Sequence, residues 1–348
     1  MKNELFDLID KLQKGRSLTE YEYEKLIRKY DSDLASYTAE KARQEAQKHY
    51  GNDIYIRGLI EISNYCKNDC YYCGIRKSNL NCIRYRLTKD EILECCKEGH
   101  DLGFRTFVLQ GGEDGHYTDD MLCDIVSTIK ADYPDCAITL SLGERSYESY
   151  KKLWDAGADR YLLRHETADK DHYQRLHPKE LSFEKRMECL RNLKDIGYQV
   201  GCGFMVGSPY QTSENLAKDL KFIEEFSPHM CGIGPFIRHK DTPFKDEKDG
   251  SVELTLFLLS LIRLIKPTIL LPATTALGTL STDGRERGIL AGANVIMPNL
   301  SPLSVRKKYT LYDNKISTGQ ESAQCVDDLR SRMKEIGYNV VTAKGNAK

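Results

Sequence analysis

The chain has 348 residues, of which 40% are hydrophobic and 30% charged, and its formal net charge is −1. This composition suits one large or two ordinary globular domains, and without a long basic run it does not indicate a nucleic acid or a membrane surface as partner. No stretch approaches the ~20 apolar residues of a membrane span and no apolar signal segment opens the chain, so we expect a cytoplasmic protein.

The order of the predicted elements indicates an α/β fold. Residues 4 to about 49 predict helices, since Leu5, Ile9 and Leu12 recur at helical spacing. From residue 54 onward, short apolar strands alternate with amphipathic helices, as in parallel β/α units. The candidate strands are residues 54–62, 105–110, 136–141, 159–165, 198–206, 229–236, 268–273 and 293–297. Helices are expected at 88–101, 118–131, 146–156, 182–196, 212–226, 253–265, 282–291 and after 300.

Eight such units match a complete (β/α)8 barrel, or TIM barrel. We therefore expect an N-terminal helical extension over residues 1–50 and a barrel over residues 51–312. Residues 313–348 are expected to form a C-terminal helical region and a tail that pack on the barrel.

The first predicted strand is followed by three cysteines, Cys66, Cys70 and Cys73, at Cys-x3-Cys-x2-Cys spacing. The chain has twelve cysteines and no export signal, which favours reduced thiols over disulfides. A [4Fe–4S] cluster normally takes one cysteine per iron, so three thiolates in one loop leave one iron open to a further ligand. A structural zinc loop is the alternative, but it needs four ligands, usually in two pairs, and no second pair follows.

The spacing, with Tyr72 just before the third cysteine, resembles the radical S-adenosylmethionine (SAM) superfamily. The open iron would then chelate the amino and carboxylate groups of S-adenosyl-L-methionine. We expect Cys66, Cys70 and Cys73 to be the metal ligands and Tyr72 to lie beside the cofactor.

In a barrel of this kind the chemistry lies at the carboxyl ends of the strands. The second strand ends in Gln110, Gly111, Gly112 and Glu113, where the glycines permit close backbone approach to a ligand and Glu113 can accept from an ammonium group. A plain glycine turn before the next helix is the alternative. Ser141 ends the third strand on the face expected to point into the barrel.

The fourth strand places Arg164 and Glu166 on one face, so opposite charges would point into the barrel. A buried structural ion pair is one interpretation. Cofactor binding is the other, because the methionine zwitterion needs both an acid and a base. Arg186, on the following helix, could pair with its carboxylate, although an isolated helix arginine is more often solvated. Met205, in the fifth strand, suits either an adenine face or the core.

The strand-end segments together resemble the [FeFe]-hydrogenase H-cluster maturases of the HydE type. The resembling segments are residues 84–88, 108–114, 141–144, 159–167, 232–236, 272–275 and 293–299. The resemblance implies a closed cavity below the cofactor and cofactor contacts from Ser141, Glu166 and Arg186. It also implies a cavity lining, which comprises Gln110, Arg164, Met230, Thr274, Thr275, Met297, Tyr309 and Tyr312.

The reaction implied by this resemblance is reductive cleavage of SAM to a 5′-deoxyadenosyl radical. The radical would act on a small iron–cysteine complex bearing carbon monoxide and cyanide, in an anaerobic host. An external one-electron reductant is an expected partner, and other hydrogenase maturases are further candidates. Some family members carry a second cluster on a Cys-x7-Cys-x2-Cys pattern, but the matching positions here are Ser317, Cys325 and Asp328. We therefore predict a single cluster.

Three alternatives stay open. A methylornithine synthase-like carbon-skeleton mutase would share the fold and the first motif. Biotin synthase-like sulfur insertion would need further strand cysteines for a second cluster, and Cys136 and Cys202 are the nearest candidates. An iron–sulfur carrier or scaffold would bind a cluster without radical chemistry, and would leave SAM intact.

Overall fold

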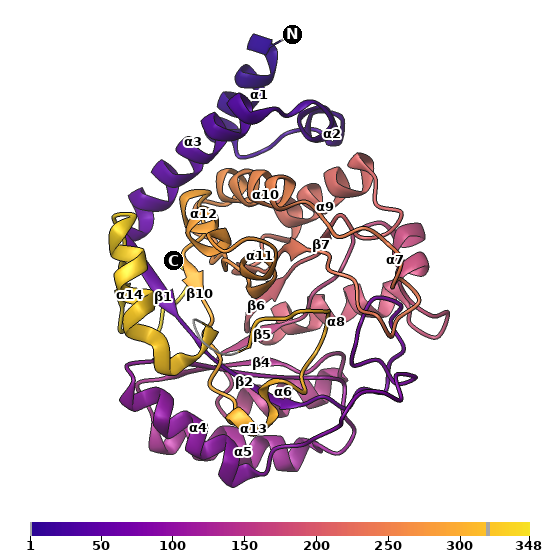
Figure 1. The fold of residues 1–348 in the computed structure, drawn as a ribbon, viewed down its shortest axis with the longest axis vertical. Coiled ribbons are helices and arrows are strands. Elements are labelled where there is room, and N and C mark those ends of the chain that lie inside the picture. The colour runs from indigo at the N-terminus through magenta and orange to yellow at the C-terminus, as the bar shows by residue number, and fades with distance from the viewer. Residues whose placement is uncertain (1, 318–320) are drawn as a thin grey trace.

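The computed structural model describes residues 2–317 and 321–348. Three helices come first, α1 (Lys2–Gly15), α2 (Glu20–Lys29) and α3 (Ser32–Tyr50). Thr19 and Glu22 form a capping box at the start of α2, and Asp31 accepts from a backbone N–H at the start of α3. The helices pack on α9 (Ser213–Phe226) and α10 (Val252–Ile265), and α1 projects beyond the rest of the molecule (Figure 1).

A parallel sheet forms the centre of the molecule, in the strand order β2-β3-β4-β5-β6-β8. Its strands are β2 (Gly58–Ser63), β3 (Thr106–Gly111), β4 (Ala137–Ser141), β5 (Arg160–Leu162), β6 (Gln199–Cys202) and β8 (Met230–Cys231). The intervening helices are α4 (Lys89–Asp101), α5 (Asp119–Asp132), α6 (Tyr147–Asp155), α7 (Lys170–Leu176), α8 (Phe183–Ile196) and α9. The α/β alternation expected from the sequence is therefore present.

Beyond β8 the pairing continues through single bridges. Met230 pairs with Leu270, and Pro272 pairs with Val295 in β10 (Val295–Ile296). Asn299 then pairs with Leu59 of β2. A short sheet of β7 (Met205–Val206) and β9 (Gly234–Pro235) lies beyond the ends of β6 and β8. The remaining helices are α11 (Thr275–Leu280), α12 (Gly284–Leu290), α13 (Leu303–Arg306), η2 (Ala323–Cys325) and α14 (Val326–Glu335).

The predicted strand at 54–62 is two strands. β1 (Asp53–Ile56) lies between β10 and β11 (Asn339–Val341) in a separate three-stranded sheet, while β2 belongs to the central one. The break falls at Arg57, which is buried and whose Nη1 lies 3.0 Å from Met230 Sδ. Because β11 was expected to be helical or tail, the sequence pattern did not reveal its pairing with β1.

The loop that carries the three cysteines, residues 64–86, has no helix and is held by distant segments. Its backbone N–H groups donate to three carbonyls: Lys67 to Glu113 (2.9 Å), Tyr71 to Leu176 (3.0 Å) and Gly74 to Leu311 (2.8 Å). The end of β3, the end of α7 and the segment after α13 thus fix the cysteine positions together.

Gly112, just after β3, lets the backbone there pass very close to the start of the cysteine loop. A Cβ atom added at Gly112 would lie 2.1 Å from Tyr65 O and 2.8 Å from Cys66 Cβ. Neither distance is possible for a real Cβ atom, so any side chain here would move the segment that contains Cys66.

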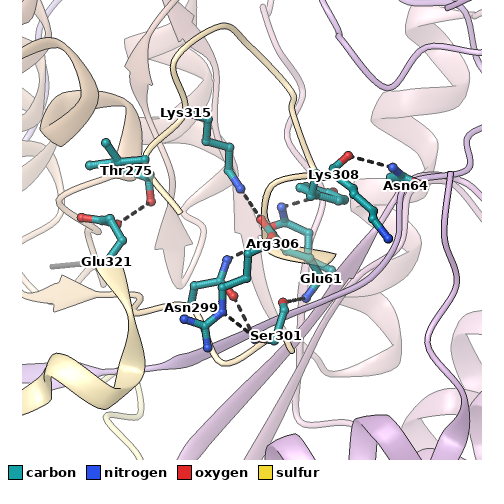
Figure 2. Close-up of polar contacts among 12 residues, drawn as sticks. Glu61, Asn64, Thr275, Asn299, Ser301, Arg306, Lys308, Lys315 and Glu321 are labelled. Atoms are coloured by element: carbon teal, nitrogen blue, oxygen red, sulfur yellow. Dashed lines mark hydrogen bonds and ion pairs between the residues drawn. The ribbon is translucent and has the colours of Figure 1, made fainter. Parts of the chain in front are cut away.

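A buried ion pair ties the segment after α13 to β2 (Figure 2). Lys315 Nζ lies 2.5 Å from Oε1 of Glu61, whose side chain is inaccessible to solvent. Asn299 Nδ2 donates to the other carboxylate oxygen (3.0 Å), and Glu61 N donates to Ser301 Oγ (2.8 Å). Both carboxylate oxygens and the backbone N–H of Glu61 therefore have partners inside the protein.

We predict that Lys315→Met destabilises the protein, because it leaves the Glu61 carboxylate buried without its cation. Breaking a buried pair costs about 3–5 kcal/mol, which corresponds to a fall of roughly 10 °C in Tm. Thermal unfolding of the anaerobic protein measures it. Glu61→Gln in the same chain should recover much of the loss, and Lys307→Met, at an exposed lysine, is the control. Equal Tm values for the Lys315 and Lys307 variants would contradict the prediction.

We also predict that Gly112→Ala lowers iron incorporation, because the added methyl group displaces Cys66. Gly115→Ala is a matched control, since a Cβ atom there meets nothing within 4 Å. Iron and sulfide per chain after anaerobic reconstitution should fall below half of the wild-type value for Gly112→Ala and stay near it for Gly115→Ala. Full loading of both variants would show that Gly112 does not position the cysteine loop.

Candidate iron–sulfur and cofactor site

The three predicted metal ligands lie near enough to one another for their charges to interact. Burial raises the pKa of the Cys66, Cys70 and Cys73 thiols, that of Cys73 to about 12, and the neighbouring thiols raise the pKa of Cys70 further. Burial and mutual repulsion thus disfavour three thiolates unless a cation joins them.

The spacing of these thiols separates a cluster from a single ion. Within residues 2–317 and 321–348, the one group of three such ligands whose donor atoms all lie within 4.8 Å is His100, Asp135 and Cys136. The Cys66, Cys70 and Cys73 sulfurs are not such a group, so as placed they are too far apart for one ion. A multi-iron cluster spans wider distances, and these donors fit it better than they fit zinc.

Tyr72 is half-buried next to the cysteines and donates to a histidine. Its hydroxyl lies 3.1 Å from His177 Nε2, and His177 Nδ1 lies 2.9 Å from Tyr173 O. Burial lowers the pKa of His177 to about 3, so the ring is neutral at pH 7. Because Nδ1 must carry the proton donated to the carbonyl, Nε2 accepts from Tyr72. Sequence reasoning missed His177, which has no ligand spacing to reveal it.

Arg164 and Glu166 lie together at the end of β5 with hydrogen-bonding capacity to spare. Arg164 Nη2 is 3.5 Å from Glu166 Oε2, and neither atom has a hydrogen-bond partner although both are buried. Glu166 also has a positive φ of 66°, which costs a non-glycine residue about 1 kcal/mol or more. Its backbone N–H donates to Gly203 O (3.0 Å), which holds this conformation. A loose, buried pair on strained backbone is suited to a polar ligand.

Arg186 reaches the same place from α8. Its Nε donates to Glu144 Oε1 (2.5 Å) and its Nη1 donates to Arg164 O (2.6 Å). The guanidinium is therefore buried and oriented rather than solvated. Glu144 is a partner that the sequence analysis did not assign, although it ends the segment that contains Ser141.

The other expected cofactor residues lie at neighbouring strand ends or beside the cysteine loop. Gly111 ends β3, paired with Ser63, and Ser141 ends β4, paired with Gln110. The two carboxylate oxygens of Glu113 are used within the protein, Oε1 accepting from Glu144 N (3.0 Å) and Oε2 pairing with Lys67 Nζ (3.1 Å). Met205 lies in an apolar cluster with Leu176, Phe236, Phe244, Tyr71 and Tyr72.

The predicted cavity residues differ in how fully their polar atoms are used. Gln110 Nε2 donates to Tyr309 OH (3.4 Å), and Thr275 Oγ1 donates to Glu321 Oε2 (3.3 Å; Figure 2). Thr274 Oγ1 is buried and has no hydrogen-bond partner. The threonine hydroxyl with free capacity is therefore that of Thr274.

The remaining predicted cavity residues are Met230, Met297 and Tyr312, and Arg57 is a further buried residue that was not predicted. Met230 and Met297 share an apolar cluster with Leu270 and Val295. Burial raises the pKa of Tyr312, so its phenol is neutral. Arg57, whose Nε and Nη2 are buried without partners, was missed by sequence reasoning because it lay inside a predicted strand.

The cysteines proposed for a second, sulfur-donating cluster lie at different levels of the sheet. Thr139 of β4 pairs with Arg160 of β5, which pairs with Gln199 of β6, so Thr139 and Gln199 lie at the same height in the sheet. Cys136 precedes Thr139 by three residues along the chain, and Cys202 follows Gln199 by three. Six residues of strand correspond to ~20 Å. Cys136 instead lies beside Asp135, which pairs with Arg105 Nε (2.7 Å). Of the positions matching the optional C-terminal cluster, Ser317 is buried, Cys325 half-buried and Asp328 exposed, and residues 318–320 lie outside the described residues.

In the part of the chain that the structure describes, no helix combines the length and the apolar character needed to cross a bilayer.

Comparison with known proteins agrees with this geometry. Residues 60–223 match the family model of the Radical SAM superfamily. The [FeFe] hydrogenase maturase subunit HydE of Thermotoga maritima is 46% identical over 291 residues, 84% of this chain and 83% of the relative. The 3-methylornithine synthase of Methanosarcina acetivorans is 29% identical over 85% of this chain and 83% of its own length.

Among solved structures, methylornithine synthase (PylB) superposes with a TM-score of 0.84 at 27% identity, covering 96% of this chain and 97% of that chain. This similarity places the central sheet and its helices in a TIM-barrel-like radical SAM fold. Radical SAM enzymes use a [4Fe–4S] cluster and SAM, for which the chain presents three thiols on one loop and an acid–base pair with buried polar atoms. The identity of 46% over 84% of its length shows that this chain belongs to the HydE family of radical SAM [FeFe]-hydrogenase maturases.

Proposed function

We propose that this enzyme acts in the assembly of the [FeFe]-hydrogenase H-cluster, on a small iron–cysteine complex bearing carbon monoxide and cyanide. The identity of 46% to a HydE maturase, against 29% to a methylornithine synthase, favours this function over the carbon-skeleton mutase. The observation that carries the proposal is the set of buried polar groups with spare capacity at the strand ends, on Arg164, Glu166 and Thr274.

In this proposal Cys66, Cys70 and Cys73 hold the single [4Fe–4S] cluster. When bound and reduced, the cluster supplies the electron that cleaves SAM into methionine and a 5′-deoxyadenosyl radical. The residues around it exclude water and orient SAM, since burial at the site is extensive.

The chain would hold SAM through several strand ends. Glu166 Oε2 is free to accept from a hydroxyl or ammonium group, while Arg186, fixed by Glu144, is placed to pair with a carboxylate. Ser141, Gly111 and Gly112 would approach from β3 and β4. Tyr72 and Met205 would supply an apolar wall, since they share one cluster. Glu113 would act mainly through the loop it holds.

The substrate would lie deeper, in a cavity below SAM. Arg164 offers positive charge to an anionic complex, and the Thr274 hydroxyl can donate to a cyanide nitrogen. Tyr309 with Gln110, Thr275 with Tyr312, and the Met230–Met297 cluster would form its walls. We propose that the bridges at Leu270, Pro272 and Asn299 close the sheet into a complete barrel around this space.

We propose that the chain is organised in three parts. Residues 1–50 form a helical extension, residues 51–312 the catalytic barrel, and residues 313–348 a C-terminal region packed on it. We propose a cytoplasmic, anaerobic enzyme that depends on an external one-electron reductant and works with other hydrogenase maturases.

The function is tested by adding the reconstituted protein to a hydrogenase maturation mixture that lacks its HydE component. Recovery of hydrogenase activity, absent with Cys66→Ala, supports the proposal. Cleavage of SAM without recovery of hydrogenase activity would redirect it to another radical reaction, and intact SAM would favour the carrier or scaffold.

Glu166→Gln should weaken SAM binding without changing the cluster spectrum, because the carboxylate contacts SAM and not iron. Loss of a charge-assisted contact costs about 1.5–3 kcal/mol, or roughly tenfold to a hundredfold in Kd. Equilibrium binding of SAM to the reconstituted variant, with its absorption spectrum as control, gives the answer. An unchanged Kd would remove Glu166 from the SAM site.

Thr274→Val should leave SAM cleavage without substrate intact but suppress its stimulation by the iron–cysteine complex. The change removes one free hydroxyl and keeps the shape, so we expect about a tenfold higher substrate concentration for half-maximal stimulation, or ~1.4 kcal/mol. Thr255→Val is the control, since that hydroxyl donates within α10 to Ser251 O (2.8 Å). Assay of 5′-deoxyadenosine measures both, and equal stimulation in the two variants would exclude Thr274 from the cavity.

A further inference from the structure

The outer side of the cysteine loop exposes apolar side chains. Leu80 is 94% exposed and Ile83 69% exposed, and Tyr65 lies at the base of the same loop with 36% exposure. Of the eight large apolar side chains that are exposed within the described residues, three lie in these 23 residues, 64–86. Single exposed apolar residues need no explanation, but a group on one loop marks a candidate contact surface.

The loop is held rigidly, so these side chains are not exposed by disorder. The Arg84 guanidinium donates to the backbone carbonyls of Asn64, Ile75, Arg76 and Asn79. Asn79 Nδ2 donates across the loop to Gly74 O (2.7 Å). A surface fixed in advance loses less conformational entropy when a partner binds.

The cysteine loop carries a net positive charge, although the chain as a whole does not. Residues 64–86 contain five lysines and arginines and one aspartate, whereas the whole chain has a net charge of −1. Arg76, Arg86 and Lys67 pair with Asp69, Asp114 and Glu113. Among the described residues, no acidic side chain pairs with Lys77, which is exposed and leaves its charge for a partner, whereas the Arg84 guanidinium is occupied by carbonyls of the loop itself.

A second segment adds to this surface. Asn64 Nδ2 donates both to Ile83 O (2.9 Å) and to Lys308 O (2.8 Å), so the segment after α13 lies beside the loop (Figure 2). Lys308 has no ion-pair partner among the described residues. We define the loop patch as Lys77, Leu80, Ile83 and Lys308.

The loop patch connects directly to the cysteine ligands. Arg76 N donates to Cys73 O (3.1 Å), and Lys77 N donates to Asn68 O (2.9 Å), between Cys66 and Cys70. Glu166 and Arg164 approach the cysteines from the strand ends, whereas the patch covers the solvent side of the same loop. A protein docked on the patch would therefore stand next to the cluster without entering the barrel.

We infer that the loop patch is the docking site of a small acidic one-electron carrier protein that reduces the cluster. The apolar centre provides burial, and the unpaired cations attract an acidic surface and fix its orientation. One electron leaves the carrier, which is oxidised, and enters the oxidised cluster, and cleavage of one SAM consumes it. The inference rests on the cluster of the family and deepens the proposed function, but it does not depend on the substrate in the barrel.

Lys77→Glu and Leu80→Asp test the inference in the reconstituted full-length enzyme, with a reduced bacterial ferredoxin and a flavodoxin as probes. Lys334→Glu and Tyr21→Asp are matched controls, since both residues are exposed and lie on α14 and α2. Titration gives Kd for each carrier, and stopped-flow absorbance gives the rate of cluster reduction. We expect a Kd at least tenfold higher for both patch variants, no change in the controls, and a salt dependence that weakens in Lys77→Glu.

Reduction by dithionite separates this inference from the proposed function. Dithionite needs no docking, so both patch variants should cleave SAM with it at the wild-type rate. Should either variant lose iron, Ile83→Ser and Lys308→Gln replace it. Carrier Kd values within twofold of wild type in the patch variants would overturn the inference, even if hydrogenase maturation succeeds. Failure of maturation with intact carrier binding would overturn the proposed function alone.

Discussion

A loop without regular secondary structure has to hold three thiols at fixed positions, and the rest of the site depends on how this is done. Buried thiols repel one another as thiolates, so the loop cannot derive its shape from the ligands themselves. Instead its backbone is bound to the end of β3, the end of α7 and the segment after α13. These three segments come from distant parts of the chain, and the cysteine geometry therefore forms only when the fold is complete.

The second constraint is that a charged side chain buried at a strand end needs partners for its charge and its hydrogen bonds. Buried ions are normally paired and hydrogen-bonded, as Glu61 is with Lys315 and Asn299. Arg164 and Glu166 depart from this pattern, since their contact is long and their polar atoms are unsatisfied. The two pairs therefore differ in kind: the first holds a segment in place, and the second has the unused hydrogen-bonding capacity on which the proposed SAM and substrate contacts rest.

The sequence predicted those features of the fold and the site that depend on residues close together in the chain. Strand and helix alternation predicted the central elements, and the cysteine spacing indicated from the sequence alone which loop would carry the metal ligands. Long-range pairing was not accessible in this way. Neither the division of the first strand at Arg57 nor the pairing of β11 with β1 has a local signature, because both depend on what lies opposite. For the same reason Glu144 and His177 were identified as the partners of Arg186 and Tyr72 only in the structure.

The cysteine loop separates two environments that radical chemistry must keep apart. In the function that we propose, electrons arrive from a carrier protein in solvent, whereas the radical forms where water is excluded. The solvent side of the loop is basic and partly apolar, and on the other side lie Glu166, Arg164 and the strand ends. The segment after α13 contacts both regions, since Lys308 lies beside the loop and Lys315 reaches Glu61 inside. That segment therefore connects the outer face of the cysteine loop to β2 of the central sheet.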